Sequence, residues 1–121
     1  EVPKKISVSA VAKIEDASIS HSDFIGWGPR LAPFRSLMDK AWRTRAHGDF
    51  WSHMLVAEGA VDIAAEPSLA LWDMAALDII VREAGGRFTN IDGVDGSLGG
   101  SGLSTNAALH EYVVTALKVA G

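Results

Sequence analysis

The chain has 121 residues, a formal net charge of −4 and 48% hydrophobic residues, which is enough chain to bury one hydrophobic core. The acidic balance argues against a nucleic-acid surface, which needs clustered Lys and Arg, and no apolar stretch reaches the roughly 18 residues of a membrane span. The absence of cysteine excludes disulfides and thiolate metal sites and fits a reducing compartment, so we expect a cytoplasmic protein without nucleic-acid or membrane partners.

The first part of the chain is predicted to form two strands and one helix. Residues 6–12 and 17–22 alternate apolar and polar side chains, as strands do. A Gly-Trp-Gly-Pro break at residues 26–29 follows. Apolar residues then recur every three or four positions through residues 31–42, which predicts a one-sided helix with charged residues on its other face.

The middle of the chain continues the alternation of strands and helices. A short strand is expected at residues 43–46, and a second helix begins near Asp49 and ends at Gly59. Residues 61–65 indicate a buried strand, and residues 66–68 indicate the turn after it.

The last third begins with a nearly all-apolar helix that starts near Asp73 and stops at a Gly-Gly pair. Strands are expected at residues 87–91 and 103–105, separated by a glycine-rich loop that lacks any phosphate-binding fingerprint. Asn106 is expected to cap a final helix. This alternation predicts a layered α/β domain.

Three acids stand at the ends of these elements. Asp73, where its helix begins, is either a cap worth about 0.3–1 kcal/mol or an oxygen ligand of the kind that magnesium prefers. Glu66, beside the rigid Pro67, is by its position alone an exposed strand-end acid. Asp49 is either a helix-start acid or a ligand contact, since Gly48 lets backbone approach a ligand closely.

Two histidines, His47 and His53, flank Asp49 in the sequence. The His-Glu-x-x-His spacing of zinc hydrolases is absent. We therefore expect structural or substrate-shaping roles for both, and catalysis by neither.

The motifs around the third helix resemble a known family. Trp-Asp-x-Ala-Ala at residues 72–76, followed by Ile-Val-x-Glu-Ala-Gly-Gly at residues 80–86, is similar to the C-terminal signature of the inositol monophosphatase superfamily of magnesium-dependent phosphomonoesterases. The resemblance covers nearly the whole chain. Ala-His-Gly-Asp-Phe at residues 46–50 is most similar to the histidinol-phosphatase branch found in actinobacteria.

The resemblance implies the layered sheet-and-helix fold of these phosphatases, of which the chain supplies the C-terminal lobe. It also implies Asp73 as a catalytic Mg²⁺ ligand, and Glu66, Asp49 and Gly48 as substrate contacts. The family's other metal-binding segments, Gly-Asp-x-x-Glu and Asp-Pro-Ile/Leu-Asp-Gly-Thr, do not occur, and the chain does not begin with Met. We therefore expect residues 1–121 to be the C-terminal part of a longer enzyme, without its N-terminal metal-binding part.

The function implied by the resemblance is hydrolysis of histidinol phosphate in histidine biosynthesis, with water as the nucleophile. Inositol 1-phosphate or another sugar phosphate is the alternative substrate. A non-catalytic binding or assembly fragment is the alternative of another class. The expected partners are a small phosphate ester, the N-terminal part of the same enzyme and a second copy in a homodimer.

Overall fold

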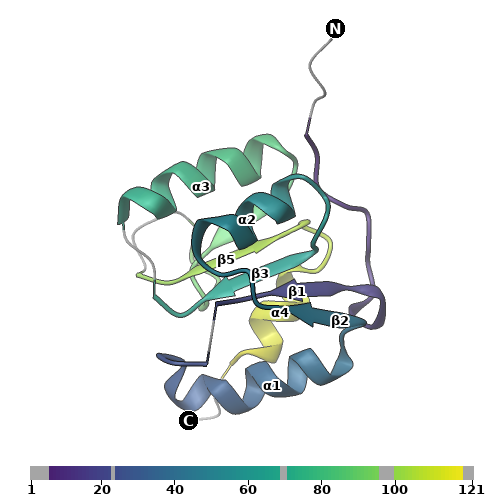
Figure 1. The fold of residues 1–121 in the computed structure, drawn as a ribbon, viewed down its shortest axis with the longest axis vertical. Helices are drawn as coiled ribbons and strands as arrows, with labels where there is room; N and C mark the ends of the chain where they lie inside the picture. Colours follow the sequence, from purple (N-terminus) through teal and green to yellow (C-terminus); the bar gives the residue numbers. More distant parts are fainter. Residues whose placement is uncertain (1–5, 23, 69–70, 96–99, 119–121) are drawn as a thin grey trace, which may run out of the picture.

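The computed structural model describes residues 6–22, 24–68, 71–95 and 100–118, without the side chains of residues 49–50 and 71–73. Within this part of the chain, a mixed sheet of five strands lies between two pairs of helices (Figure 1). Helices α2 and α3 cover one face, and α1 and α4 cover the other. The predicted layered α/β fold is confirmed.

The sheet combines parallel and antiparallel strands. The strand order is β2-β1-β3-β5-β4, in which β1 runs parallel to both β2 and β3, whereas β5 is antiparallel to both β3 and β4. The carboxyl ends of β1, β2 and β3 therefore share one edge, the place where open α/β sheets bind ligands. The strands are β1 Ser18–Ser20, β2 Arg43–Arg45, β3 Ile63–Glu66, β4 Arg87–Thr89 and β5 Gly102–Thr105.

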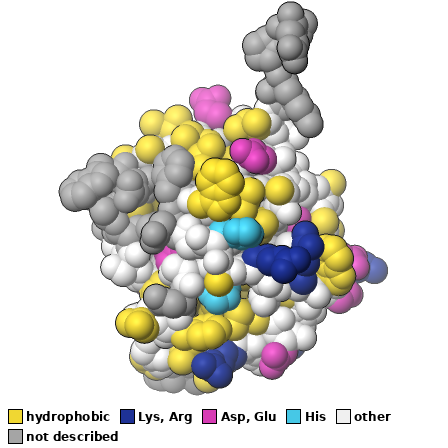
Figure 2. Space-filling model, viewed as in Figure 1, with side chains coloured by type: hydrophobic (Ala, Val, Ile, Leu, Met, Phe, Trp, Pro, Cys, Tyr) yellow, Lys and Arg dark blue, Asp and Glu magenta, His cyan; other side chains and the backbone are white. Residues whose placement is uncertain are grey.

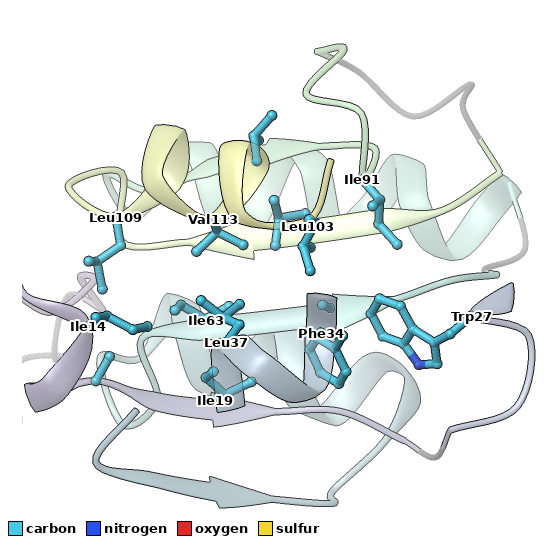
Figure 3. Close-up of a cluster of buried hydrophobic side chains, with 14 residues drawn as sticks. Ile14, Ile19, Trp27, Phe34, Leu37, Ile63, Ile91, Leu103, Leu109 and Val113 are labelled. Atoms are coloured by element: carbon cyan, nitrogen blue, oxygen red, sulfur yellow. The ribbon is translucent and has the colours of Figure 1, made fainter. Parts of the chain in front are cut away.

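Side-chain alternation along the strands separates two apolar layers. Ile63 and Ala65 of β3 join the larger cluster under α1 and α4 (Figure 3), whereas Ala64 packs against Val56 of α2. No helix among the described residues has the length and hydropathy needed to cross a membrane. The α-helices are α1 Leu31–Lys40, α2 Asp49–Ala57, α3 Leu71–Glu83 and α4 His110–Ala116, with short 3₁₀ turns at Ile14–Asp16 and Gly28–Arg30.

The end of α3 agrees with its predicted glycine stop. The helix ends at Glu83, and the chain turns through Gly85 and Gly86 into β4. A Cβ at Gly86 would lie 2.5 Å from the carbonyl oxygen of Thr105 on β5. Only glycine permits this close approach of two backbones.

The strand predicted at residues 6–12 is wrong. This segment runs alongside the layers without joining the sheet (Figure 1), and the N–H of Val8 donates to the carbonyl of Ala84 after α3 (3.0 Å). Its alternation has another cause, since Val8 packs on the helices while the Ser9 hydroxyl binds Asp62.

The prediction that Asn106 caps the final helix is also wrong, because Asn106 caps the turn before that helix. Asn106 Oδ1 accepts the N–H of Leu109 (3.2 Å), in a turn where Ala107 has a φ of +73°. Helix α4 begins only at His110, because this turn comes between β5 and the helix.

A buried carboxylate holds the segment of residues 6–12 in place. Asp62, 5% exposed, accepts the backbone N–H of Ser18 (2.7 Å) and the hydroxyl of Ser9. The Asn106 amide donates to Ser9 Oγ (3.0 Å) and to the carbonyl of Val11 (2.7 Å). The network joins β1, β3 and β5 at the edge opposite to the carboxyl ends of the parallel strands.

We predict that Asp62→Asn lowers the free energy of unfolding by about 1.5–3 kcal/mol. The amide has no negative charge, and its NH₂ group would face either the Ser9 hydroxyl or the Ser18 N–H, both of which donate to Asp62. Urea denaturation measures the difference. Asp39→Asn, on the exposed side of α1, is the matched control and is expected to stay within about 0.5 kcal/mol of the parent. Equal effects of the two substitutions would contradict the role of this network.

Candidate active site

The carboxyl ends of β1 and β2 continue side by side beyond the sheet. The N–H of His21 donates to the carbonyl of Arg45 (3.1 Å), and the N–H of Gly48 donates to the carbonyl of His21 (3.1 Å). The start of α2 is therefore tied by backbone bonds to the residues that follow β1. Strand β3 ends at the same edge with Glu66.

Glu66 is a buried and oriented carboxylate. Glu66 is only 2% exposed. The Ser22 hydroxyl donates a hydrogen bond to its Oε2 atom (2.6 Å). Hydrogen bonds to an ionised carboxylate are stronger than those between neutral groups. The exposed strand-end acid that the sequence left open as an alternative is excluded.

Gly48 stands beside this pair. Its φ of +79° favours glycine, and a Cβ there would lie 3.3 Å from Cβ of Ser22. Ser22 therefore lies between Gly48 and Glu66, and the structure brings these two predicted residues together. Sequence reasoning did not single out Ser22, which was expected as the last residue of the strand at residues 17–22.

Asp49 and Asp73 both stand in the first turn of a helix, at the starts of α2 and α3. Their side chains lie outside the description, so their contacts with substrate and metal stay predictions. Helix α3 starts soon after β3 ends at Glu66. Both acids are thus at positions where a carboxylate complements the positive helix end.

The residues present fit a magnesium site only in part. Among the side chains that the structure describes, no group of three or more His, Asp and Glu gathers to hold a metal ion. The carboxylate of Asp73 is the donor type that Mg²⁺ prefers, but near-octahedral coordination needs further oxygen ligands. The ligand role predicted for Asp73 would therefore require oxygen ligands beyond those that the described residues bring together.

An aromatic and basic group flanks the edge. The His21 ring stacks on Phe24 (5.1 Å between centroids), and the Arg35 guanidinium lies 4.8 Å from the Phe24 ring. Phe24 remains 41% exposed. Figure 2 shows histidine side chains on this view of the molecule, with hydrophobic and basic side chains around them.

His53, predicted to be structural or substrate-shaping, lies between α2 and the sheet. It is 0% exposed, its Nδ1 lies 2.6 Å from Ser104 Oγ, and its ring meets Phe88 edge-on. Burial lowers the pKa of His53 to about 3. The imidazole is therefore neutral at physiological pH.

His110 is a second buried histidine, at the start of α4. Its Nε2 lies 2.8 Å from Thr89 Oγ1 and its Nδ1 lies 2.9 Å from Thr105 Oγ1. Thr89 already donates its hydroxyl to the carbonyl of Asn90 (2.6 Å), so Nε2 of His110 carries the proton and Nδ1 accepts. Burial, helped by the positive charge of Arg87, lowers the pKa of His110 to about 4.

Sequence comparison identifies the class of protein. The profile of the inositol monophosphatase family matches residues 3–120. The chain therefore belongs to the inositol monophosphatase family.

Individual relatives are histidinol-phosphatases. The one from Mycobacterium tuberculosis is 57% identical over 118 residues, covering 96% of this chain and 45% of the relative. The one from Streptomyces coelicolor is 50% identical over 112 residues, covering 91% of this chain and 42% of the relative. The expected resemblance to the actinobacterial branch is confirmed, and the chain spans less than half the length of these curated relatives.

Solved structures agree with the fold. The Thermotoga maritima IMPase superposes with a TM-score of 0.83 at 26% identity, covering 94% of this chain and 45% of that chain. The extragenic suppressor protein SuhB from Bartonella henselae superposes with a TM-score of 0.83 at 29% identity, covering 94% and 47%. The described domain thus corresponds to one lobe of these proteins.

We predict that acid destabilises the protein through His53 and His110. Below the ordinary pKa of 6.5, the unfolded chain binds protons that the folded chain excludes, so the free energy of unfolding falls as the pH falls. Each histidine contributes about 1.4 kcal/mol per pH unit until its own folded pKa is reached. Urea denaturation between pH 7.5 and 4.5 measures the slope.

The variants His53→Gln and His110→Gln are each expected to reduce this slope. A slope that is the same in both variants and the parent would contradict the assignment.

Proposed function

We propose that this chain is the C-terminal part of a magnesium-dependent phosphatase that hydrolyses histidinol phosphate to histidinol and phosphate. The observation that carries the proposal is the 57% identity to the Mycobacterium tuberculosis histidinol-phosphatase over 96% of the chain. The arrangement of Gly48, Ser22 and Glu66 at the carboxyl ends of parallel strands supports it.

Glu66 suits a cationic substrate. Histidinol phosphate carries an ammonium group and a protonatable imidazole, and a fixed buried carboxylate forms charge-assisted hydrogen bonds with either group. Ser22 keeps the carboxylate in one orientation, so the substrate does not bear the cost of ordering it. Asp49, which follows Gly48, is proposed to contact the same organic part of the substrate.

Water is the proposed nucleophile, as in the magnesium-dependent phosphomonoesterases that the sequence resembles, and Ser52 and Ser104 are fully buried. Ser22 donates to Glu66, while Ser52 is paired with Ser20 and Ser104 with His53, both beneath the surface. Asp73 would hold magnesium jointly with acids from outside this chain, and the metal, when bound, would stabilise the negative charge of the reacting phosphate.

The outer surface of α2 and α3 supports a partner in the same enzyme. Trp51 and Ile79 are each 57% exposed, and Ala75 and Ala76 of α3 are also exposed; Figure 2 shows hydrophobic side chains over this region. Exposed apolar patches often mark protein–protein interfaces. We propose that the N-terminal part packs on this face, and that the complete enzyme is a cytoplasmic homodimer.

Inositol 1-phosphate is the second candidate substrate. The inositol-1-monophosphatase of Caulobacter vibrioides is 37% identical over 67 residues, covering 54% of this chain and 26% of that protein. The residues of the site would serve a polyol through the same hydrogen bonds. A non-catalytic assembly role is the remaining alternative, and substrate kinetics separate all three.

We predict that Glu66→Gln and Asp49→Asn in the complete enzyme lower kcat/KM for histidinol phosphate about ten- to a hundredfold. Each substitution removes one charge-assisted bond worth about 1.5–3 kcal/mol. Inositol 1-phosphate, which has no cationic group, is the internal control and should lose much less. Ser22→Ala, which leaves the Glu66 carboxylate in place without its donor, should give a smaller loss in the same direction.

Both substrates are measured on each variant at saturating Mg²⁺. Equal losses on the two substrates would show that these acids shape the site without binding the cationic groups of histidinol phosphate. A wild-type preference for inositol 1-phosphate would replace the leading function with the second candidate.

A further inference from the structure

A column of stacked side chains joins α1 to the residues that follow β1. The Arg35 guanidinium of α1 lies 4.8 Å from the centre of the Phe24 ring, and the Phe24 ring stacks on the His21 ring (5.1 Å between centroids, 29° between planes). The His21 ring also meets the Phe34 ring of α1 edge-on (5.6 Å between centroids). The residue directly before Ser22 is therefore held between two rings.

Phe24 is the exposed ring of this column. Phe34 is 0% exposed and stacks on Trp27 (4.0 Å between centroids) inside the larger apolar cluster (Figure 3), whereas Phe24 is 41% exposed and lies outside that cluster. A ring at such a position adds little to the hydrophobic core, because much of its surface stays in water. Its contacts with His21 and Arg35 constrain the segment after β1 instead.

The same segment lies against the end of β3. The Ser22 hydroxyl donates to Oε2 of Glu66 (2.6 Å), and a Cβ at Gly26 would lie 3.5 Å from Cγ of Pro67. Phe24 stands midway between these two contacts in the sequence. Loss of its ring therefore frees the chain that carries the serine, and with it the orientation of the buried carboxylate.

We propose that Phe24 is a positioning residue of this site: its ring keeps Ser22 in the place from which it orients the Glu66 carboxylate. The kinetic consequence rests on the proposed phosphatase function, in which Glu66 binds the cationic part of the substrate. The structural consequence, an ordered segment after β1, is independent of that function.

Removal of the ring in the complete enzyme tests the kinetic consequence. We expect Phe24→Leu to raise KM for histidinol phosphate about fivefold with kcat changed less than about twofold, because the substitution weakens substrate binding at Glu66 alone. Phe24→Tyr, which keeps the ring, should stay near the wild-type KM.

Trp42→Leu is the matched control. Trp42 is 63% exposed and has the Arg43 guanidinium 4.6 Å from its ring, but it lies at the amino end of β2, away from the site. Its loss should leave KM unchanged. A KM of Phe24→Leu equal to that of Trp42→Leu would overturn the proposal.

A double substitution shows whether Phe24 acts through Ser22. In a Ser22→Ala background the hydroxyl that orients Glu66 is gone, so Phe24→Leu should raise KM by less than about 1.5-fold further. The full fivefold effect in that background would contradict the proposed route through Ser22.

Amide hydrogen exchange gives a readout that does not need activity. The N–H of His21 donates to the carbonyl of Arg45 (3.1 Å), and the N–H of Gly48 donates to the carbonyl of His21 (3.1 Å). Both amides should exchange about fivefold faster in Phe24→Leu and at the parent rate in Phe24→Tyr.

The Asp62 amide is the internal reference, because it is bonded to the carbonyl of Ser18 at the other end of β1 (3.0 Å) and should keep its parent rate. Equal acceleration of all three amides, or none at His21 and Gly48, would overturn the proposal. If the wild-type enzyme hydrolyses neither histidinol phosphate nor inositol 1-phosphate, the proposed function fails, and the exchange rates still decide the role of Phe24.

Discussion

The hydrogen bond from Ser22 to the buried carboxylate of Glu66 is the interaction on which the rest of the site depends. A carboxylate taken out of water is costly unless it is hydrogen-bonded, so the end of β3 requires a donor from the residues that follow β1. Gly48 fits beside that donor because it has no Cβ, and its backbone is bonded to His21. The ends of three strands and the start of α2 are therefore held in one arrangement.

The two faces of the sheet are stabilised by different kinds of contact. Under α1 and α4, a continuous apolar cluster around Phe34 and Leu37 (Figure 3) supplies the hydrophobic stabilisation. Under α2, hydroxyl and imidazole groups take part of the space that apolar groups would fill. Such contacts add less stability than apolar packing but specify geometry more closely, which suits the helix that begins at the candidate site.

Local sequence features predicted what depends on neighbours in the chain. The spacing of apolar residues predicted α1 and α3, and the glycines after α3 marked its end. The alternation of apolar and polar residues at 6–12 led to a wrong strand prediction, because an extended segment packed on helices has the same pattern as a strand. Ser22 and Glu66 are 44 positions apart, and His53 and Ser104 are 51 apart. Neither pair is visible in the sequence, since each contact requires the sheet order to be known.

We propose that this chain carries the substrate-binding edge and one metal-binding acid, and that the remaining acids come from a second part of the enzyme. Residues 1–121 can be mixed with the part of the Mycobacterium tuberculosis histidinol-phosphatase that this chain does not cover, and phosphate release from histidinol phosphate measured with Mg²⁺. We expect release only from the mixture. With the Asp73→Asn chain, which should still co-elute with its partner, release should fall at least about 10²-fold. Release by residues 1–121 alone at the rate of the mixture, or release unaffected by Asp73→Asn, would contradict the account.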